Sequence, residues 1–142
     1  MLKKIFLIIM AAVVINSGFL ARAAEARVSQ PATVIAYYFH GSFRCFTCNA
    51  MEKYSKEAIE TNFKDALKSG GIEFKEINVE DKGNEHYIKD YGLYTKSLVL
   101  SMIKDGKEIK HKNLDKIWEY AKNEKEFIEY VTVEINNFMK EE

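Results

Sequence analysis

The chain has 142 residues, which is enough for a single domain with one hydrophobic core. Hydrophobic residues make up 47% and charged residues 30%, with one proline and seven glycines, a composition that excludes collagenous and disordered proteins. The formal charge is zero and lysines alternate with glutamates, so we expect no nucleic-acid partner, because such a partner requires a concentrated basic face.

The first 23 residues have the features of a secretory signal peptide. Lys3 and Lys4 precede an apolar run over residues 5–15, and small residues then stand at both positions of an A-x-A cleavage site. We expect cleavage after Ala23, with Ala26 as the alternative, and export to the periplasm or another extracytoplasmic space of a bacterium. The apolar segment is shorter than the roughly 20 residues of a spanning helix, so we expect no membrane insertion after cleavage.

The remaining residues, 24–142, predict one domain that begins with a strand, a helix and a second strand. Residues 33–39 form a continuous apolar run rich in β-branched and aromatic side chains, which is typical of a buried strand. A helical period follows over residues 46–68 and ends at a pair of glycines. Apolar and polar residues then alternate over residues 72–79, which predicts the second strand.

The second half of the domain predicts a hairpin between helices. The expected elements cover residues 84–91 (helix), 98–103 (buried strand), 107–111 (edge strand), 114–121 (helix) and 127–139 (helix). Asp105 and Gly106 form a strong hairpin signal, Asn123 is the expected N-cap of the last helix, and Trp118 is expected in the core. Because a helical crossover joins the first two strands, they should be parallel. The predicted fold class is α/β, with a central mixed sheet of about four strands and helices on both faces.

The only cysteines, Cys45 and Cys48, lie between the first strand and the start of the first long helix. Amides at a helix N-terminus lack intrahelical partners and the macrodipole there favours negative charge, so both effects stabilise a thiolate. Arg44 adds a neighbouring positive charge. We therefore expect Cys45 to attack, with a lowered pKa, and Cys48, one turn later and less exposed, to resolve. The same spacing allows the two residues to close a disulfide.

Two alternatives to a redox pair are open. The thiolates of Cys45 and Cys48 supply two of the four ligands of a tetrahedral metal site, which predicts a metal- or metalloid-binding module, with His40 as the nearest further ligand. His86 and His111 are expected to be ordinary surface histidines. The other alternative is an accessory subunit with an inert structural disulfide, although so short a loop removes little entropy from the unfolded chain.

These motifs resemble thioredoxin across most of residues 24–142. The run VIAYYFHGSFRCFTC corresponds to a buried strand entering CxxC, and FKEINVED corresponds to a second strand with an acidic end. The later landmarks are Tyr91-Gly92-Leu93 and Lys104-Asp105-Gly106. The resemblance implies a thioredoxin-like fold and a thiol–disulfide oxidoreductase.

More narrowly, the segments FHGSFRCFTC, YTKSLVL and KNLDKIWE resemble the ArsF family. Its members are exported thioredoxin-like proteins named as subunits of a nitrophenyl-compound reductase. The resemblance implies electron transfer with a protein disulfide or dithiol partner, or with a membrane electron donor, in a system that reduces aromatic nitro groups. The sequence contains no flavin or nicotinamide fingerprint, so we expect no cofactor.

The chain departs from thioredoxin around the cysteines. Arg44 stands before the motif, Phe46 and Thr47 stand inside it, and Ser97 takes the place of the cis-proline that faces the cysteines in thioredoxins. A cis bond before a residue other than proline costs roughly 2.5–4 kcal/mol. The resemblance implies that these four residues form the substrate or partner loop. The aromatic residues Phe43 and Phe46, which flank the motif, suggest an apolar docking surface for a partner.

Proton transfer requires a different residue from the one in thioredoxin. The buried aspartate that assists it there has no counterpart, because Tyr37, Tyr38 and Phe39 occupy that part of the strand. His40 is the candidate for acid–base assistance, since histidine titrates near neutral pH. The alternative is a histidine at the strand end that is exposed to water.

Overall fold

The structure is a computed structural model that describes residues 31–141. Its elements in chain order are β1 (Thr33–His40), α1 (Phe46–Asn62), α2 (Lys64–Ser69), β2 (Ile72–Asn78), α3 (His86–Asp90), β3 (Ser97–Lys104), β4 (Lys107–Asn113), α4 (Ile117–Tyr120) and α5 (Glu124–Lys140). The predicted signal peptide and both of its cleavage positions lie outside this range. Within residues 31–141, no helix has both the length and the apolar character needed to cross a membrane.

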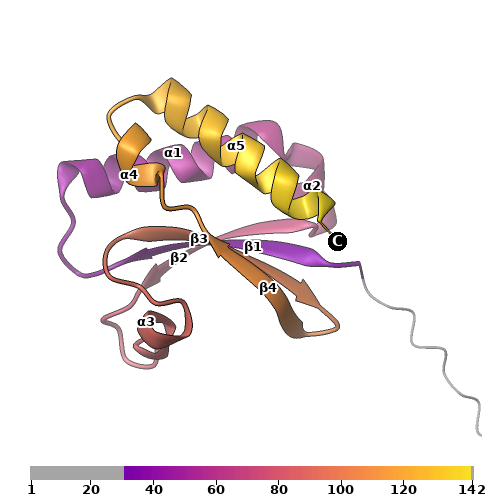
Figure 1. Ribbon diagram of the computed structural model, residues 1–142, viewed down its shortest axis with the longest axis horizontal. Helices are drawn as coiled ribbons and strands as arrows, with labels where there is room; N and C mark the ends of the chain where they lie inside the picture. The colour runs from indigo at the N-terminus through magenta and orange to yellow at the C-terminus, as the bar shows by residue number, and fades with distance from the viewer. Residues whose placement is uncertain (1–30, 142) are drawn as a thin grey trace, which may run out of the picture.

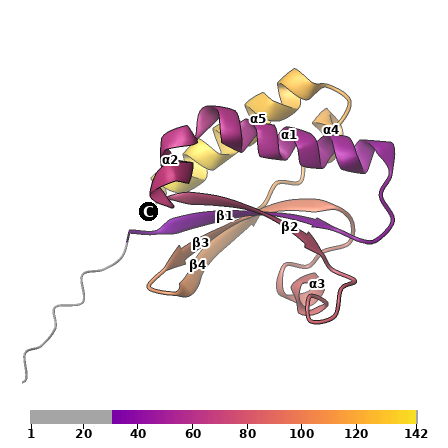
Figure 2. The ribbon, with the colours of Figure 1, turned by 180° about the vertical axis from the view of Figure 1, so that it is seen from behind.

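The strands form one open mixed sheet in the order β2-β1-β3-β4. β1 and β2 are parallel, with Val34 opposite Ile72 and His40 opposite Asn78, whereas β3 is antiparallel to both β1 and β4. Helices α1, α2, α4 and α5 cover one face of the sheet and α3 covers the other (Figures 1 and 2). The predicted α/β class, the four-stranded mixed sheet and the helices on both faces are therefore confirmed.

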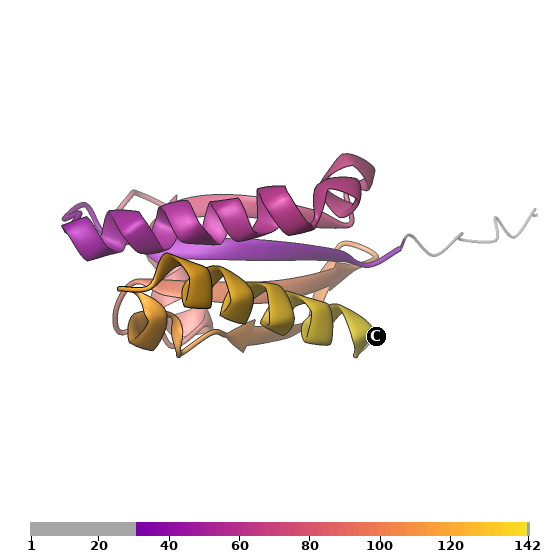
Figure 3. The same cartoon turned by 90° about the horizontal axis from the view of Figure 1, so that it is seen from above.

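The central strand β1 is buried on both faces. Val34, Ala36 and Tyr38 belong to the larger core, under α1 and α5, which lie side by side across the sheet (Figure 3). The alternate side chains of β1 pack with the α3 region, where Tyr37 and Phe39 lie against Tyr87 and Tyr91. Burial on both faces explains why β1 is a continuous apolar run rather than an alternating one.

The single helix predicted over residues 46–68 is wrong. The chain leaves the helix at Phe63 (φ −126°, ψ 34°) and starts again as α2. Phe63 is buried in the larger core, and its neighbours keep helical spacing on both sides of the break. The spacing of apolar residues therefore does not reveal the break between α1 and α2. The backbone turns at Phe63, but the Phe63 side chain stays in the core, so the apolar pattern continues.

Other local predictions are confirmed or corrected. The hairpin turn has Asp105 and Gly106 at φ 50° and 75°, as its sequence predicts. The Oδ1 atom of Asn123 caps α5 by accepting a hydrogen bond from the Glu126 amide. Helices α3 and α4 are shorter than predicted, and β4 runs further, to Asn113.

Trp118 is not a core residue, so that prediction is wrong. Its side chain is 41% exposed, and its indole Nε1–H donates to the carbonyl of Lys96 at 2.9 Å. The other three residues of the predicted apolar stripe, Leu114, Ile117 and Ala121, are buried. The polar indole nitrogen, however, needs a partner, and it finds one in the loop before β3 at the surface.

We expect the core of β3 to control the stability of the sheet. Leu100 is fully buried in the larger core, so Leu100→Ala removes packing on a central strand and should cost about 2–5 kcal/mol of unfolding free energy. Ile109 on the edge strand β4 is 52% exposed, and Ile109→Ala is the matched control, expected to cost less than about 1 kcal/mol. Urea unfolding followed by circular dichroism measures both; equal costs would contradict the assigned core.

Candidate functional site

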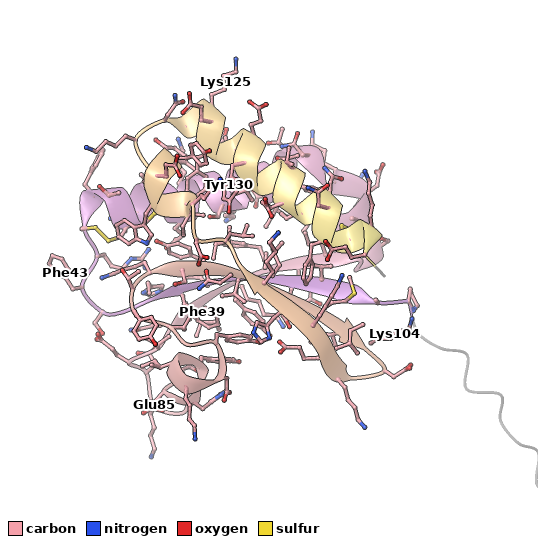
Figure 4. All side chains as sticks on the ribbon, viewed as in Figure 1. Phe39, Phe43, Glu85, Lys104, Lys125 and Tyr130 are labelled. Atoms are coloured by element: carbon pink, nitrogen blue, oxygen red, sulfur yellow. A yellow bond between two sulfur atoms is a disulfide. The ribbon has the colours of Figure 1, made fainter. Side chains whose placement is uncertain are left out.

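Cys45 and Cys48 are joined by a disulfide at the start of α1, where Figure 4 draws the bond between the two sulfur atoms. Cys45 is the N-cap of α1, and its Sγ accepts a hydrogen bond from the Cys48 amide at 3.1 Å. Cys48 is 1% exposed, whereas Cys45 is only half-buried. The predicted difference in burial is confirmed, and the helix amide expected to stabilise a thiolate already points at the Cys45 sulfur.

The chain just after β2 holds the loop that leads to the cysteines. The Val79 amide donates to the carbonyl of His40 at 2.9 Å, and a Glu80 carboxylate oxygen accepts from the Ser42 amide at 3.0 Å. The hydrogen bonds from Ser42 lower the pKa of Glu80 below its ordinary 4.5. A Cβ on Gly41 would lie 2.5 Å from the other Glu80 oxygen, so glycine permits this close approach. Residues just after β2, the strand next to β1, therefore hold the loop between β1 and α1 in place.

Arg44 does not act on Cys45 alone, as the sequence had suggested. Its Nη1 donates to Glu76 at 2.9 Å, and its Nη2 is paired with Glu52. Nη1 also lies 3.2 Å from Nε2 of His40. Two carboxylates therefore compensate one guanidinium, and the positive charge expected beside the thiolate is largely neutralised.

His40 is buried at the end of β1, so the alternative of an exposed histidine is wrong; its exposed fraction is 8%. Its Nδ1 lies 2.8 Å from the carbonyl of Gly41, and a carbonyl only accepts, so Nδ1 carries a proton. Its Nε2 lies 3.0 Å from an oxygen of Glu76. We call His40, Arg44, Glu52 and Glu76 the charge cluster.

Sequence reasoning missed Glu52 and Glu76. Glu52 lies four residues after Cys48 on α1, a spacing that places two side chains on one helix face, so the helix period could have indicated it. Glu76 is brought to Arg44 by strand register, because it pairs with Tyr38 in the parallel ladder. No sequence signal fixes that register to the residue.

Within residues 31–141, the charge cluster also holds the one group of three side chains with metal-ligand geometry. The ligand atoms of His40, Glu52 and Glu76 lie within 4.8 Å of one another. The guanidinium of Arg44 binds both carboxylates, so a positive group already occupies this position and a metal ion would have to displace it. The residues present therefore do not fit a metal centre.

His86 and His111 lie at the surface, as predicted. Their side chains are 55% and 44% exposed, and each is bound to a carboxylate near it in sequence, Asp90 at 2.7 Å and Glu108 at 2.9 Å. Both residues lie outside the charge cluster and serve below as controls for it.

Tyr38 connects the sheet to the cysteine pair. Its hydroxyl donates to the carbonyl of Cys48 at 2.7 Å, and its ring lies 6.3 Å from that of His40. Burial raises the pKa of Tyr38, an effect that the nearby Arg44 charge only partly opposes. Tyr38 therefore remains a protonated hydrogen-bond donor and fixes the start of α1 against the sheet.

Exposed aromatic side chains lie in the cysteine loop and in the loop before β3. Phe43 is 75% exposed and Phe46 91% exposed, and Tyr94, in the loop before β3, is fully exposed. Phe43 points away from the body of the protein in Figure 4, and the ammonium of Lys96 lies 5.9 Å from its ring centroid. A cavity of about 170 Å³ lies between the two loops, with His40 and Tyr94 in its lining. The rings of Phe43 and Phe46, from which the sequence predicts an apolar docking surface, are therefore both exposed.

Ser97 begins β3 opposite Phe39, the residue before His40. Its hydroxyl donates to the carbonyl of Thr95 at 2.9 Å, and the side chain is 6% exposed. Every peptide bond in residues 31–141 is trans, including the one before Ser97. Thr47, inside the CxxC motif, is half-buried. The serine hydroxyl is thus used within its own loop.

No family model, no curated protein and no solved structure matches this chain.

We expect Glu52 to set the acidity of the attacking thiol. Glu52→Gln removes a negative charge from the cluster and frees part of the Arg44 charge, so the pKa of Cys45 in the reduced protein should fall by about half a unit or more. Thiolate absorbance against pH, in a Cys48→Ala background, measures this pKa. Glu60→Gln, which removes another α1 carboxylate paired with a lysine, is the control. An unchanged or raised pKa in the Glu52 variant would contradict the assignment.

Proposed function

We propose that this protein is an exported thiol–disulfide oxidoreductase of thioredoxin-like fold. One observation carries the proposal: a disulfide at the N-terminus of a long helix, with one cysteine partly exposed and the other buried. A structural disulfide needs no such asymmetry. A redox pair does, because only the sulfur that meets the partner has to be exposed.

The proposed reaction consists of two thiol–disulfide exchanges. In the reduced protein, the Cys45 thiolate attacks one sulfur of a partner disulfide, which forms a mixed disulfide and releases the other partner sulfur as a thiolate. Cys48, deprotonated, then attacks the Cys45 sulfur and releases the second partner thiolate. The products are a reduced partner and the Cys45–Cys48 disulfide, so two electrons have moved. A dithiol partner reverses the sequence.

The thioredoxin-like assignment is supported by the order of the elements around the pair. A parallel crossover contains the cysteines at the start of its helix, and an antiparallel hairpin and a final helix follow. We extend the proposal to the ArsF family because of the sequence segments quoted above. In that role the protein would exchange electrons with a partner disulfide or dithiol, or with a membrane donor, within a system that reduces aromatic nitro compounds.

The reduction potential of the cysteine pair tests the function. Purified protein is freed of metal, equilibrated in glutathione and dithiothreitol buffers, and assayed for free thiols. A reversible two-electron transition between about −120 and −270 mV is expected, since known catalysts of this kind span that range. Cys48→Ser should form a stable mixed disulfide with a partner through Cys45, because the resolving step is lost.

Two results would contradict the proposal. A potential below about −300 mV would identify a structural disulfide. A protein that retains metal as isolated and does not oxidise cleanly would instead support a thiolate-binding module.

We expect the exposed rings of Phe43 and Phe46 to bind an apolar partner surface. The double change to serine should lower kcat/KM by about tenfold for a dye-labelled apolar peptide disulfide. It should leave the rate with glutathione disulfide nearly unchanged, because that substrate is small and charged. Val133→Ser, at an exposed apolar position on α5, is the control. Equal losses with both substrates would instead indicate damage to the cysteine loop.

A further inference from the structure

Each ring nitrogen of His40 has a hydrogen-bond partner of the right kind in both the neutral and the protonated state of the imidazole. Nδ1 carries a proton in both states, because it donates to the carbonyl of Gly41. When Nε2 is unprotonated, it can accept from Nη1 of Arg44 at 3.2 Å. When Nε2 is protonated, it can donate to the carboxylate of Glu76 at 3.0 Å. A buried site satisfied in both states is suited to gain and lose a proton.

The charge cluster also favours such a proton. With neutral His40, one guanidinium and two carboxylates leave the cluster with one net negative charge. A proton on His40 brings the cluster to neutrality. The groups that face His40 from the elements around it are Tyr38 on β1, Arg44 before α1, Glu52 on α1, Glu76 on β2, Glu80 after β2, and Lys96 before β3.

The cluster is joined to both cysteines. Arg44 is the residue immediately before Cys45, and its side chain carries the contact to His40. Glu52 lies one helical turn after Cys48. Within residues 31–141, Nε of Arg44 is a buried group without a hydrogen-bond partner, so the present guanidinium arrangement leaves one donor unused. A thiolate on Cys45 would add a second negative charge beside the cluster and a new acceptor for this donor.

We propose that His40 takes up a proton when the Cys45–Cys48 disulfide is reduced, and so couples the redox state of the pair to pH. The proposal rests on the redox function above and specifies how that site is regulated. With a dithiol partner, the disulfide receives two electrons and the partner becomes a disulfide. Of the two protons that the partner loses, one goes to Cys48, which becomes a thiol, and the other goes to Nε2 of His40. Cys45 remains as a thiolate, and protonated His40 donates to Glu76.

The coupling acts in both directions. If reduction raises the proton affinity of His40, then protonation of His40 must favour reduction by the same factor. Protonation of His40 also affects Arg44. Once Nε2–H binds Glu76, that carboxylate holds the guanidinium less strongly, so the guanidinium can turn toward the Cys45 thiolate. His40 acts through Arg44 and Glu76 rather than on sulfur, so it is a positioning residue.

The test uses the unmodified protein, which has three histidines. NMR spectra of the histidine ring carbons are recorded from pH 5 to 8 in the oxidised and the dithiothreitol-reduced states, with His40→Gln used to assign the signals. The His40 titration should have its midpoint at higher pH in the reduced state than in the oxidised state. The shift should correspond to a proton affinity that is about threefold higher or more. His86 and His111, each paired with a carboxylate, are internal controls that should not move. Equal movement of all three, or none for His40, overturns the proposal.

A second measurement compares redox equilibria. The ratio of the equilibrium constants of the wild type and His40→Gln in the same glutathione buffer cancels the proton dependence of the buffer. This ratio should change with pH, at most tenfold per pH unit, or about 30 mV for a two-electron couple. His86→Gln should give a constant ratio. If the variant does not fold, Glu76→Gln takes its place, because it removes the negative charge that stabilises a proton on Nε2.

The outcomes separate the two proposals. A pair that cannot be reduced reversibly contradicts the oxidoreductase itself. A pair that cycles reversibly while His40 titrates identically in both states, and while the ratio stays constant with pH, contradicts only the proton coupling.

Discussion

The parallel pairing of β1 with β2 places the whole candidate site. Parallel neighbours cannot be joined by a tight turn, so the chain must cross over the sheet through α1 and α2 before it returns. Helix α1 therefore begins at the carboxyl end of β1, and its unpaired amides lie beside the residues that end both strands. The cysteines, His40 and the loop held by Glu80 meet at this edge for that reason.

Charge at this edge is balanced rather than concentrated. A free arginine next to Cys45 would stabilise a thiolate strongly, as a helix N-terminus already does. Glu52 and Glu76 oppose that effect by binding the guanidinium of Arg44. The Cys45 thiolate of the reduced state then depends on the N-terminus of α1 and on any positive charge that the charge cluster gains. A histidine that accepts a proton inside such a cluster is one way for the fold to adjust this balance.

Much of the architecture follows from local patterns in the sequence. The continuous apolar run of β1 predicts a strand buried on both faces, and the Asp105-Gly106 pair predicts the hairpin. Predictions failed where tertiary packing differs from what the helical spacing of apolar residues indicates. The helix breaks at Phe63 although the apolar spacing continues, and Trp118 lies at the surface because its indole N–H bonds to the loop before β3. The residues next to Phe63 and Trp118 in the sequence do not indicate either outcome.

By itself, the sequence determined the cysteine pair, its place between a buried strand and a helix, and the expectation that Cys48 is less exposed than Cys45. The place of the pair depends on neighbouring residues, and the expected difference in exposure depends on helix geometry. Only the tertiary structure decided what surrounds the pair. Glu76 reaches Arg44 through strand register, and the residues after β2 and before β3 lie around His40 at the end of β1. Such contacts join residues more than thirty positions apart, and no local pattern specifies which of many similar carboxylates will meet.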